Sequence, residues 1–238
     1  MSEQIQIGEI RVTVIRKKIR NIHLSVHPPS GHVTISAPAR MKLDTIRVFA
    51  ISKLSWIKQQ QKQLVEQERE TPREYLDRES HYVWGQRYLL KHAEASSVTT
   101  VDLHPRELIL RVRPGLSVEK KQEILDAWYR AQLKEAISML IAKWEPLIGV
   151  NVERFYVQRM KTRWGSCNHR RHTIRLNTEL ARKPRECLEY IVVHEMLHIL
   201  EPAHNARFLQ ALNNIMPNWQ YLRDILNQLP VRHENWRY

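Results

Sequence analysis

The chain has 238 residues, 42% of them hydrophobic and 26% charged, so it is long enough to bury a sizeable core. Its 38 lysines and arginines exceed its 25 acidic residues by 13, a balance that favours anionic partners, although solvated basic faces are the plainer explanation. Two cysteines are too few for a disulfide framework, and the apolar runs are far shorter than the ~20 residues of a membrane span. Because no apolar run follows a basic start in the first residues, we expect a cytoplasmic protein with no membrane partner.

Alternating apolar residues predict strands in the first part of the chain. Residues 5–16 alternate and are rich in β-branched side chains, and two shorter runs within 22–35 form a hairpin. Residues 42–69 carry apolar side chains at helical spacing, which predicts one long helix. Four short strand patterns follow within 81–113. We therefore expect a mostly antiparallel β layer with one long helix over residues 1–114, and we find no internal repeat in this sequence.

The pattern of the chain changes at Ser117, which is a good N-cap for a helix that runs to about Trp144 and is ended by Pro146 and Gly149. Beyond it, short strand patterns and helical patterns follow one another. The predicted strands are 152–160 and 173–177, the residues between them form a basic loop, and the predicted helices are 184–198, 205–215 and 219–228. Residues 115–238 therefore form a second domain, and the chain as a whole is of the α+β class.

Two histidines and a glutamate have the spacing of a metal-binding helix within HEMLHILEPAH, residues 194–204. His194 and His198 are four residues apart, so a helix places both imidazoles on one face, where they can bind the same ion. Glu195 follows the first histidine and can reach a water bound to that ion. This HExxH pattern is typical of zinc hydrolases, in which it supplies two ligands and a general base. The alternative is a half-buried helix whose histidines bond to carbonyl groups.

A third ligand is expected, because a catalytic zinc has three protein ligands and one open position. His204 is the candidate, although six further residues of helix would turn it away from the ion. Pro202 breaks the helix and disfavours α geometry at Glu201, so that the chain can bring His204 back. Glu201 and Asp224 are the alternative ligands. Metzincins have the same spacing with a glycine where this chain has Glu201, so the turn must differ here.

Other motifs accompany this segment along nearly the whole chain. They are IRKKIRNIHLSV (15–26), TISAP (34–38), KLSWI (53–57), RMKTRWGSC (159–167), IRLNTEL (174–180) and YIVVHEMLHILEPAHNARF (190–208). Together they resemble the YgjP-like metallopeptidase family, small zincins that are related to the SprT-like and minigluzincin groups. One local departure is LEPAH, where many relatives carry a basic or glycine-containing stretch.

The resemblance implies that His194, His198 and His204 bind one Zn²⁺ and that Glu195 is the catalytic base. It also implies a zincin-like α+β domain around the HExxH helix. Another divalent ion is the alternative to zinc. The expected activity is metal-dependent hydrolysis, because zinc lowers the pKa of a bound water toward ~7 and Glu195 can accept its proton.

Three substrate classes stay open, since this chemistry can attack a peptide carbonyl or a phosphorus. For a peptidase, an edge strand near RWGSC would pair with an extended peptide, and Trp164 and Ser166 would line the cleft, unless Trp164 is simply core. For a nucleoside triphosphate hydrolase, the cations of the basic loop, Arg159, Lys161 and Arg163 among them, would bind phosphate oxygens. A module that binds nucleic acid without catalysis is the third alternative, although no motif of that kind is recognisable.

Overall fold

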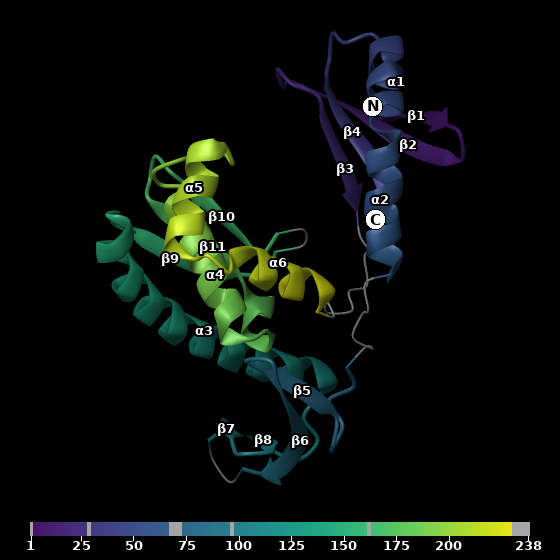
Figure 1. Ribbon diagram of the computed structural model, residues 1–238. Coiled ribbons are helices and arrows are strands. Elements are labelled where there is room, and N and C mark those ends of the chain that lie inside the picture. Colours follow the sequence, from purple (N-terminus) through teal and green to yellow (C-terminus); the bar gives the residue numbers. More distant parts are fainter. Residues whose placement is uncertain (1, 28–29, 67–72, 96–97, 161–162, 230–238) are drawn as a thin grey trace. The chain divides into compact units, whose positions relative to one another are not determined.

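The computed structural model describes residues 2–27, 30–66, 73–95, 98–160 and 163–229. It is a mixed α+β protein, as expected, and it divides near residue 70 into two compact units. The first unit is a four-stranded sheet with two helices against it (Figure 1). Its elements are β1 (Ser2–Ile7), β2 (Ile10–Lys17), β3 (His23–His27), β4 (His32–Pro38), α1 (Leu43–Ser52) and α2 (Leu54–Glu66).

The core of the first unit follows from the alternation along its strands. Val12 and Val14 of β2 and Ile35 of β4 point to one face of the sheet, where they are fully buried against Ile46 of α1 and Ile57 of α2. The antiparallel pairing of β3 with β4 confirms the predicted hairpin. The polar residues between these positions lie on the other face of the sheet.

The single helix predicted over residues 42–69 is two helices that meet at Lys53. This residue leaves α geometry, with φ −104° and ψ 8°, and its N–H donates to the carbonyl of Ala50 at 3.1 Å. The preceding Ser52 donates its hydroxyl to the carbonyl of Phe49 at 2.7 Å. Serine side chains that bond to nearby carbonyls compete with the helical pattern, a local effect that apolar spacing does not register.

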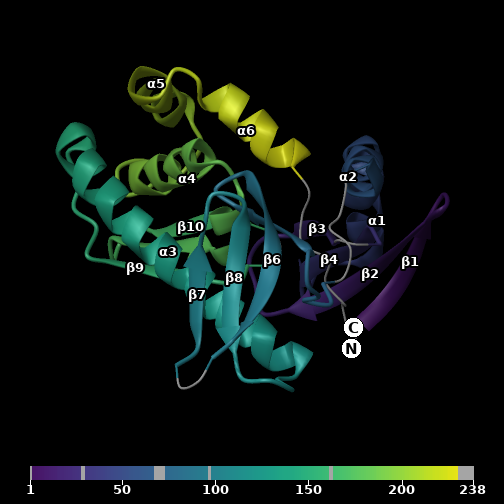
Figure 2. The same ribbon diagram turned by 90° about the horizontal axis from the view of Figure 1, so that it is seen from below.

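The second unit begins with a sheet of the same topology as the first. Its strands are β5 (Ser80–Val83), β6 (Gln86–Glu94), β7 (Thr100–Leu103) and β8 (Glu107–Val112) (Figure 2). The order β5-β6-β8-β7 matches β1-β2-β4-β3; in both sheets the outer pairs are antiparallel and the central pair is parallel. The expected single β layer is therefore two sheets. The sequence shows no repeat because buried strand positions need to be apolar but not identical.

The long helix α3 (Val118–Ile148) follows the second sheet. Ser117 caps it as predicted, accepting from the N–H of Lys120 at 3.4 Å. The helix continues through Pro146, beyond the predicted end, and stops at Gly149, which has the left-handed φ of 77° that favours glycine. Within the described residues no helix, α3 included, combines the length and the apolar character needed to cross a membrane.

This helix explains why the chain does not divide at residue 115, where the sequence placed the domain boundary. Leu125 in its first half is buried with Leu108 of β8. Leu133, two turns later, is buried in the core of the following elements. Between them, Tyr129 donates its hydroxyl to the carbonyl of Tyr82 at 2.9 Å. Because α3 contributes to both cores, β5–β8 belong to the same unit as the C-terminal half of the chain.

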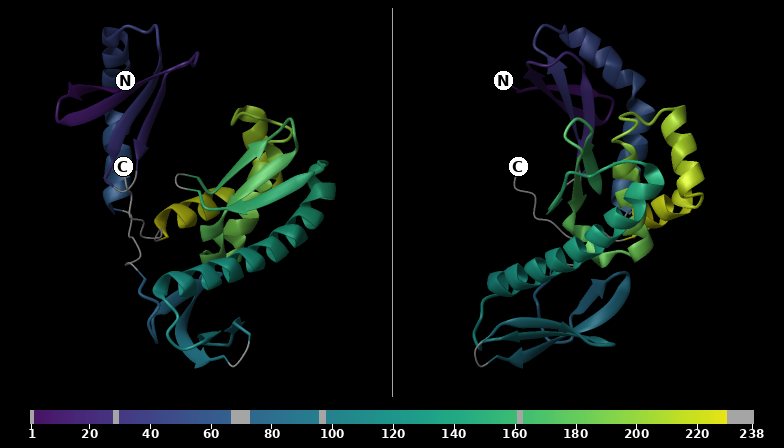
Figure 3. Two further views of the ribbon diagram at one scale, coloured as in Figure 1. Left: turned by 180° about the vertical axis from the view of Figure 1, so that it is seen from behind. Right: turned by 90° about the vertical axis from the view of Figure 1, so that its left-hand side faces the viewer.

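The remaining elements form a small sheet with helices packed against it (Figures 1 and 3). They are β9 (Arg154–Gln158), β10 (Gly165–Asn168), β11 (Thr173–Asn177), the 3-10 helix η1 (Thr178–Arg182), α4 (Arg185–Leu197), α5 (Ala206–Ile215) and α6 (Trp219–Gln228). The strand order is β10-β11-β9, with β10 antiparallel and β9 parallel to β11. Helix α4 packs on β10 and β11 and is flanked by α3, α5 and α6. All of these elements were predicted from the sequence except η1 and β10. Strand β10 lies inside the expected basic loop.

Candidate metal centre

Three histidine side chains meet at the C-terminal end of α4. His194 lies in its last turn, His198 is the residue that follows the helix, and His204 comes from the loop before α5. Nε2 of His204 lies 3.0 Å from Nε2 of His198 and 3.0 Å from Nε2 of His194. In the described part of the chain, this is the one set of three or more histidine, cysteine or acidic side chains whose potential ligand atoms lie together.

The spacing of these nitrogens fits one small cation. Three nitrogens bound to a tetrahedral zinc at about 2.0–2.1 Å lie about 3.3 Å from each other. Nδ1 of His198 donates to the carbonyl of Glu201 at 2.9 Å, so the neutral ring presents an unprotonated Nε2 to the cluster. A hydrogen bond of this kind at the remote nitrogen is typical of histidine ligands. Three imidazoles with one open position are a donor set that suits a catalytic zinc.

Helix α4 ends several residues before Pro202, the residue that was expected to break it. Its last residue is Leu197, and the N–H groups of Ile199 and Leu200 bond three residues back, to the carbonyls of Met196 and Leu197, both at 3.0 Å. The chain has therefore tightened into turns before it reaches Pro202. The break predicted between the second and third histidines is present, but it begins directly after the second one.

Glu201 and Asn205 fix the turn that brings the third histidine back. The carbonyl of Glu201 accepts from His198, and its carboxylate accepts from Nδ2 of Asn205 at 3.0 Å. Oδ1 of Asn205 in turn accepts from the N–H of Phe208 at 2.9 Å and so caps α5. His204 lies between these two residues. Glu201, one alternative for the third ligand, is thus bound to the turn and lies outside the cluster.

The ring of Phe208 packs against all three imidazoles. Its ring centroid lies 4.6 Å from that of His198, with the two rings stacked, and 5.0 Å and 4.9 Å from those of His194 and His204. Burial, and then the closeness of the other two imidazoles, lowers the pKa of His194 to about 3. Burial also lowers the pKa of His198. These two rings are therefore neutral at pH 7, the form that binds a metal.

Glu195 is buried beside this cluster. Burial raises the pKa of its carboxyl to about 8, and the positive charge of Arg163 opposes the rise. Its Oε2 atom has no hydrogen-bond partner among the described residues. A buried carboxyl oxygen without a partner is costly, and a water molecule or a cation at this place would satisfy it.

The backbone of β10 leaves room for this carboxyl at Gly165. A Cβ atom added there would lie 2.6 Å from Oε1 of Glu195 and 2.7 Å from its Cγ, distances that real Cβ atoms do not have. Gly165 does not have a left-handed φ, so the requirement is for space rather than for backbone conformation. This close contact explains why the RWGSC motif needs a glycine at this position, which the sequence alone did not explain.

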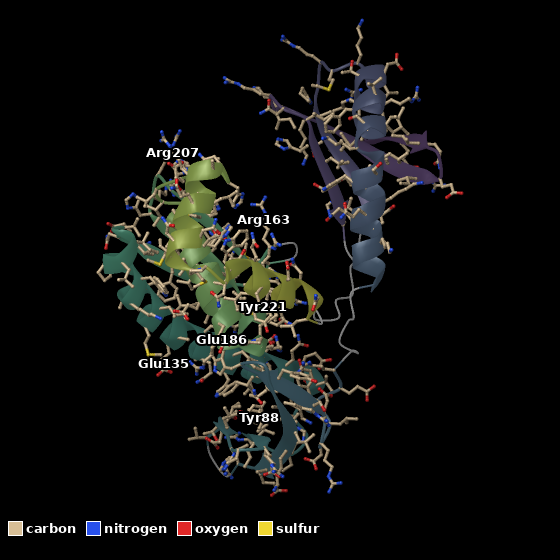
Figure 4. All side chains as sticks on the ribbon, in the orientation of Figure 1. Tyr88, Glu135, Arg163, Glu186, Arg207 and Tyr221 are labelled. Carbon is tan, nitrogen blue, oxygen red and sulfur yellow. The ribbon has the colours of Figure 1, made fainter. Side chains whose placement is uncertain are left out.

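The predicted substrate residues of the basic loop lie in different surroundings. Arg163 is exposed (Figure 4), and its positive charge lowers the pKa of Glu195 against the larger effect of burial. Arg159 is exposed just beyond the end of β9. Lys161 lies outside the described residues. Asp224, the other alternative ligand, is exposed on α6 and pairs with Arg223 at 2.9 Å, away from the histidine cluster.

Trp164 and Ser166 flank the glycine on either side. Trp164 is partly buried against the core, and Nζ of Lys183 lies 6.0 Å from the centroid of its ring. Ser166 pairs with Arg175, so it points to the face of the sheet opposite to Gly165. The neighbour on the inner face is Cys167, and burial, with the charge of Glu195 adding to it, raises the pKa of its thiol to about 11.

Asn177 holds the segment that leads into β10, a role that sequence analysis did not find. Its side-chain amide donates to the carbonyls of Met160 and Arg163 at 2.8 and 2.9 Å, and its Oδ1 accepts from the N–H of Glu179 at 3.2 Å. Its own N–H donates to the carbonyl of Trp164 at 2.9 Å. The asparagine of IRLNTEL could have been suspected from the motif, but its partners could not.

Comparisons with known proteins identify the family of this chain. The model of the YgjP-like metallopeptidase domain matches residues 20–229. The metallopeptidase zymogens abylysin from Pyrococcus abyssi and jannalysin from Methanocaldococcus jannaschii have TM-scores of 0.36 and 0.35 and sequence identities of 16% and 22%. The alignments cover 40% and 39% of this chain, and 99% and 88% of theirs. No match is found among curated proteins. The family match spans most of the chain, which therefore belongs to the YgjP-like metallopeptidase family.

Proposed function

We propose that the protein is a zinc-dependent peptidase in which His194, His198 and His204 bind the metal and Glu195 is the general base. The observation that carries this proposal is the convergence of three Nε2 atoms beside a buried carboxyl that has an unpaired oxygen. Family membership supports a metal-dependent peptidase at the level of the reaction class. The residue assignments are our inference from the geometry.

A bound zinc would supply a Lewis acid and a water whose pKa is lowered toward ~7. Oε2 of Glu195 would accept the proton of this water as it attacks the peptide carbonyl, and would later deliver it to the leaving amine. The positive ion would favour the ionised carboxylate, against the burial that now keeps its pKa at about 8. Gly165 and Phe208 would hold the base and the ligands in position.

The substrate would bind as an added strand along β10. In the described part of the chain β10 pairs with β11 and with no other strand, so its other edge presents unpaired backbone groups. The same strand carries Gly165, which touches the proposed base. An extended peptide paired with this edge would therefore lie beside Glu195, a mode of binding that depends on backbone hydrogen bonds rather than on a deep pocket.

The experiment that tests this proposal compares two glutamates of the same helix. Zinc-loaded wild type, Glu195→Gln and Glu186→Gln are incubated with denatured casein and, separately, with the four nucleoside triphosphates. Glu186 is exposed in the first turn of α4 (Figure 4), whereas His194 lies in its last turn. We expect new peptides from the wild type and from Glu186→Gln and none from Glu195→Gln.

Two results would contradict the proposal. Undiminished cleavage by Glu195→Gln would remove this residue as the base. Release of phosphate or pyrophosphate from the nucleotides, with casein left intact, would replace the peptidase by a phosphoanhydride hydrolase that uses the cations of the basic loop.

A further inference from the structure

A polar hollow of about 280 Å³ lies on the sheet β10-β11-β9. Its lining comes from all three strands and from the turn between β10 and β11. The lining residues are Glu153, Arg154, Tyr156, Asn168, Arg171, Thr173 and Arg175. Because Ile174 and Leu176 of β11 point into the core, the alternating residues Thr173 and Arg175 point to the outer face of the sheet. The hollow is therefore on the face opposite to α4 and Glu195.

Three arginines give this hollow its charge. Arg154, Arg171 and Arg175 have no ion pair with a carboxylate within the described residues; Arg154 donates to the hydroxyl of Tyr156 at 3.3 Å, and the guanidinium of Arg175 lies 5.8 Å from the centroid of that ring. Glu153 on the rim is bound by Nδ2 of Asn151 at 2.9 Å. Three arginines against one glutamate leave a net charge of about +2 in a small concave site, which favours an anionic ligand.

The turn that carries one of these arginines is braced by the lining itself. Oδ1 of Asn168 accepts from the N–H of Arg171 at 3.1 Å, and the hydroxyl of Thr173 donates to the carbonyl of Arg171 at 3.0 Å. The main chain of Arg171 is thus bonded on both sides. The guanidinium of Arg171 therefore extends from a main chain that is already fixed, so less conformational entropy is lost when it binds an anion.

We propose that this hollow is an exosite for an acidic segment of the polypeptide substrate, an inference that rests on the proposed peptidase function. Asn168, in its lining, is three residues from Gly165 along the same strand, which is about 10 Å at about 3.3 Å per residue. A peptide that pairs with β10 and passes the metal site would continue beside the hollow. Its glutamate or aspartate side chains on the outer face would meet the three arginines.

A polypeptide fits this hollow better than a nucleic acid does. Single-stranded nucleic acids bind to aromatic platforms on which bases stack, together with a groove that follows several phosphates. Tyr156 is the one aromatic residue in the lining, and Arg175 lies against its ring. The three arginines of this small hollow suit one or two carboxylates.

Binding can be measured without turnover. Zinc-loaded Glu195→Gln is titrated against a fluorescein-labelled ten-residue peptide of alternating glutamate and alanine, with fluorescence anisotropy as the readout. The matched probes are the same peptide with glutamine for glutamate and a ten-nucleotide single strand of thymidines. Arg175→Gln and Arg154→Gln are added to this background, with Arg130→Gln, an exposed arginine of α3 outside the hollow, as the control of equal charge change.

We expect the acidic peptide to bind at least about tenfold more tightly than the glutamine peptide, and each hollow variant to weaken it about tenfold, since charge-assisted arginine–carboxylate bonds are lost. Arg130→Gln should change affinity less than twofold. Equal affinity for the two peptides, or equal losses in all three variants, would overturn the exosite. Tighter binding of the oligonucleotide that depends on Arg175 would show a nucleic-acid site instead. The two proposals can fail separately. If the wild type does not cleave casein but Glu195→Gln binds the acidic peptide as expected, the peptidase proposal is contradicted and the acidic-peptide site is kept.

Discussion

The carboxyl of Glu195 lies against the main chain at Gly165, with space for a hydrogen and none for a methyl group. Two segments that are thirty residues apart in the sequence thus determine together where the proposed base can be. The contact links the RWGSC motif to the HExxH motif by steric fit rather than by a shared ligand. A single carbon atom added at Gly165 would therefore displace the proposed base.

Gly165→Ala should displace this carboxyl and lower kcat/KM for casein by about 100-fold, because a shift of about 1 Å in a catalytic group has an effect of that size. Zinc content should stay at that of the wild type, since the three atoms closest to the added Cβ all belong to Glu195 and none to a histidine. Gly115→Ala is the control, as its Cβ would meet nothing within 4 Å.

The control substitution should affect stability alone. Gly115 has a left-handed φ of 77°, so alanine should cost about 1 kcal/mol in the free energy of unfolding while activity is kept. Thermal unfolding and casein cleavage of both variants check the pair. Full activity of Gly165→Ala would mean that the close contact has no part in placing the base.

The pH dependence of stability should reveal the buried carboxyl in the metal-free protein. The pKa of a glutamate in the unfolded chain is about 4.3, whereas burial raises that of Glu195 to about 8 in the folded chain. The folded state holds this proton more tightly, so stability contributed by the neutral carboxyl is lost as the pH rises from about 4.5 to 8. Relative to Glu195→Gln, the wild type should lose about 3–5 kcal/mol over this interval.

Urea unfolding at pH 5 and pH 8.5, with a chelator present, measures this difference. Added zinc should reduce it, because a neighbouring cation favours the ionised carboxylate. Parallel pH curves for the two proteins would show that the carboxyl is solvated and not buried in solution.

Asn177→Ala should destabilise the second unit by about 2–3 kcal/mol, since four side-chain hydrogen bonds of a buried amide are lost and two carbonyls are left without their donor. Urea unfolding measures the change. Asn151→Ala, at an exposed amide with one partner, should stay within about 0.5 kcal/mol of the wild type. A similar small effect at Asn177 would mean that its hydrogen bonds do not hold the segment that enters β10.

Phe208→Ala should weaken zinc binding as well as stability. The ring is buried against all three imidazoles, and its removal leaves a cavity that costs about 3–5 kcal/mol. Phe208→Leu keeps most of the volume and should retain zinc. Competition with a chromophoric chelator measures the affinity; unchanged affinity in Phe208→Ala would show that the turn, through Glu201 and Asn205, suffices to position the ligands.

The convergence of the three histidines was predicted more closely than the fold around them. Helical spacing places His194 and His198 on one face wherever the helix lies, and a break before His204 follows from Pro202. Spacing could not reveal that the helix ends directly after His198, because the end depends on the bonds of Glu201 with His198 and Asn205. Those bonds join residues three and four apart in the chain, but they involve particular side chains and leave no periodic pattern in the sequence.

The missed parts of the fold have similar causes. Strand β10 has only four residues and begins with a glycine, so its sequence is typical of a loop. Its strand geometry comes from pairing with β11. The boundary expected at residue 115 follows a change in pattern, but Leu125 and Tyr129 join the two sides of that boundary through one helix. Local composition does not report such long-range packing.

Zinc stoichiometry after equilibration and gel filtration decides whether the three histidines bind one ion. The proteins compared are the wild type, His194→Ala, His198→Ala, His204→Ala and the control His169→Ala. His169 is exposed in the turn after β10 and lies outside the cluster. We expect one zinc per chain in the wild type and in His169→Ala, and less than about a tenth of that in each of the other three, since a catalytic site with two imidazoles no longer holds the ion. Full occupancy in any of those three, or a wild type that retains no zinc, would contradict the assignment of the three histidines as ligands.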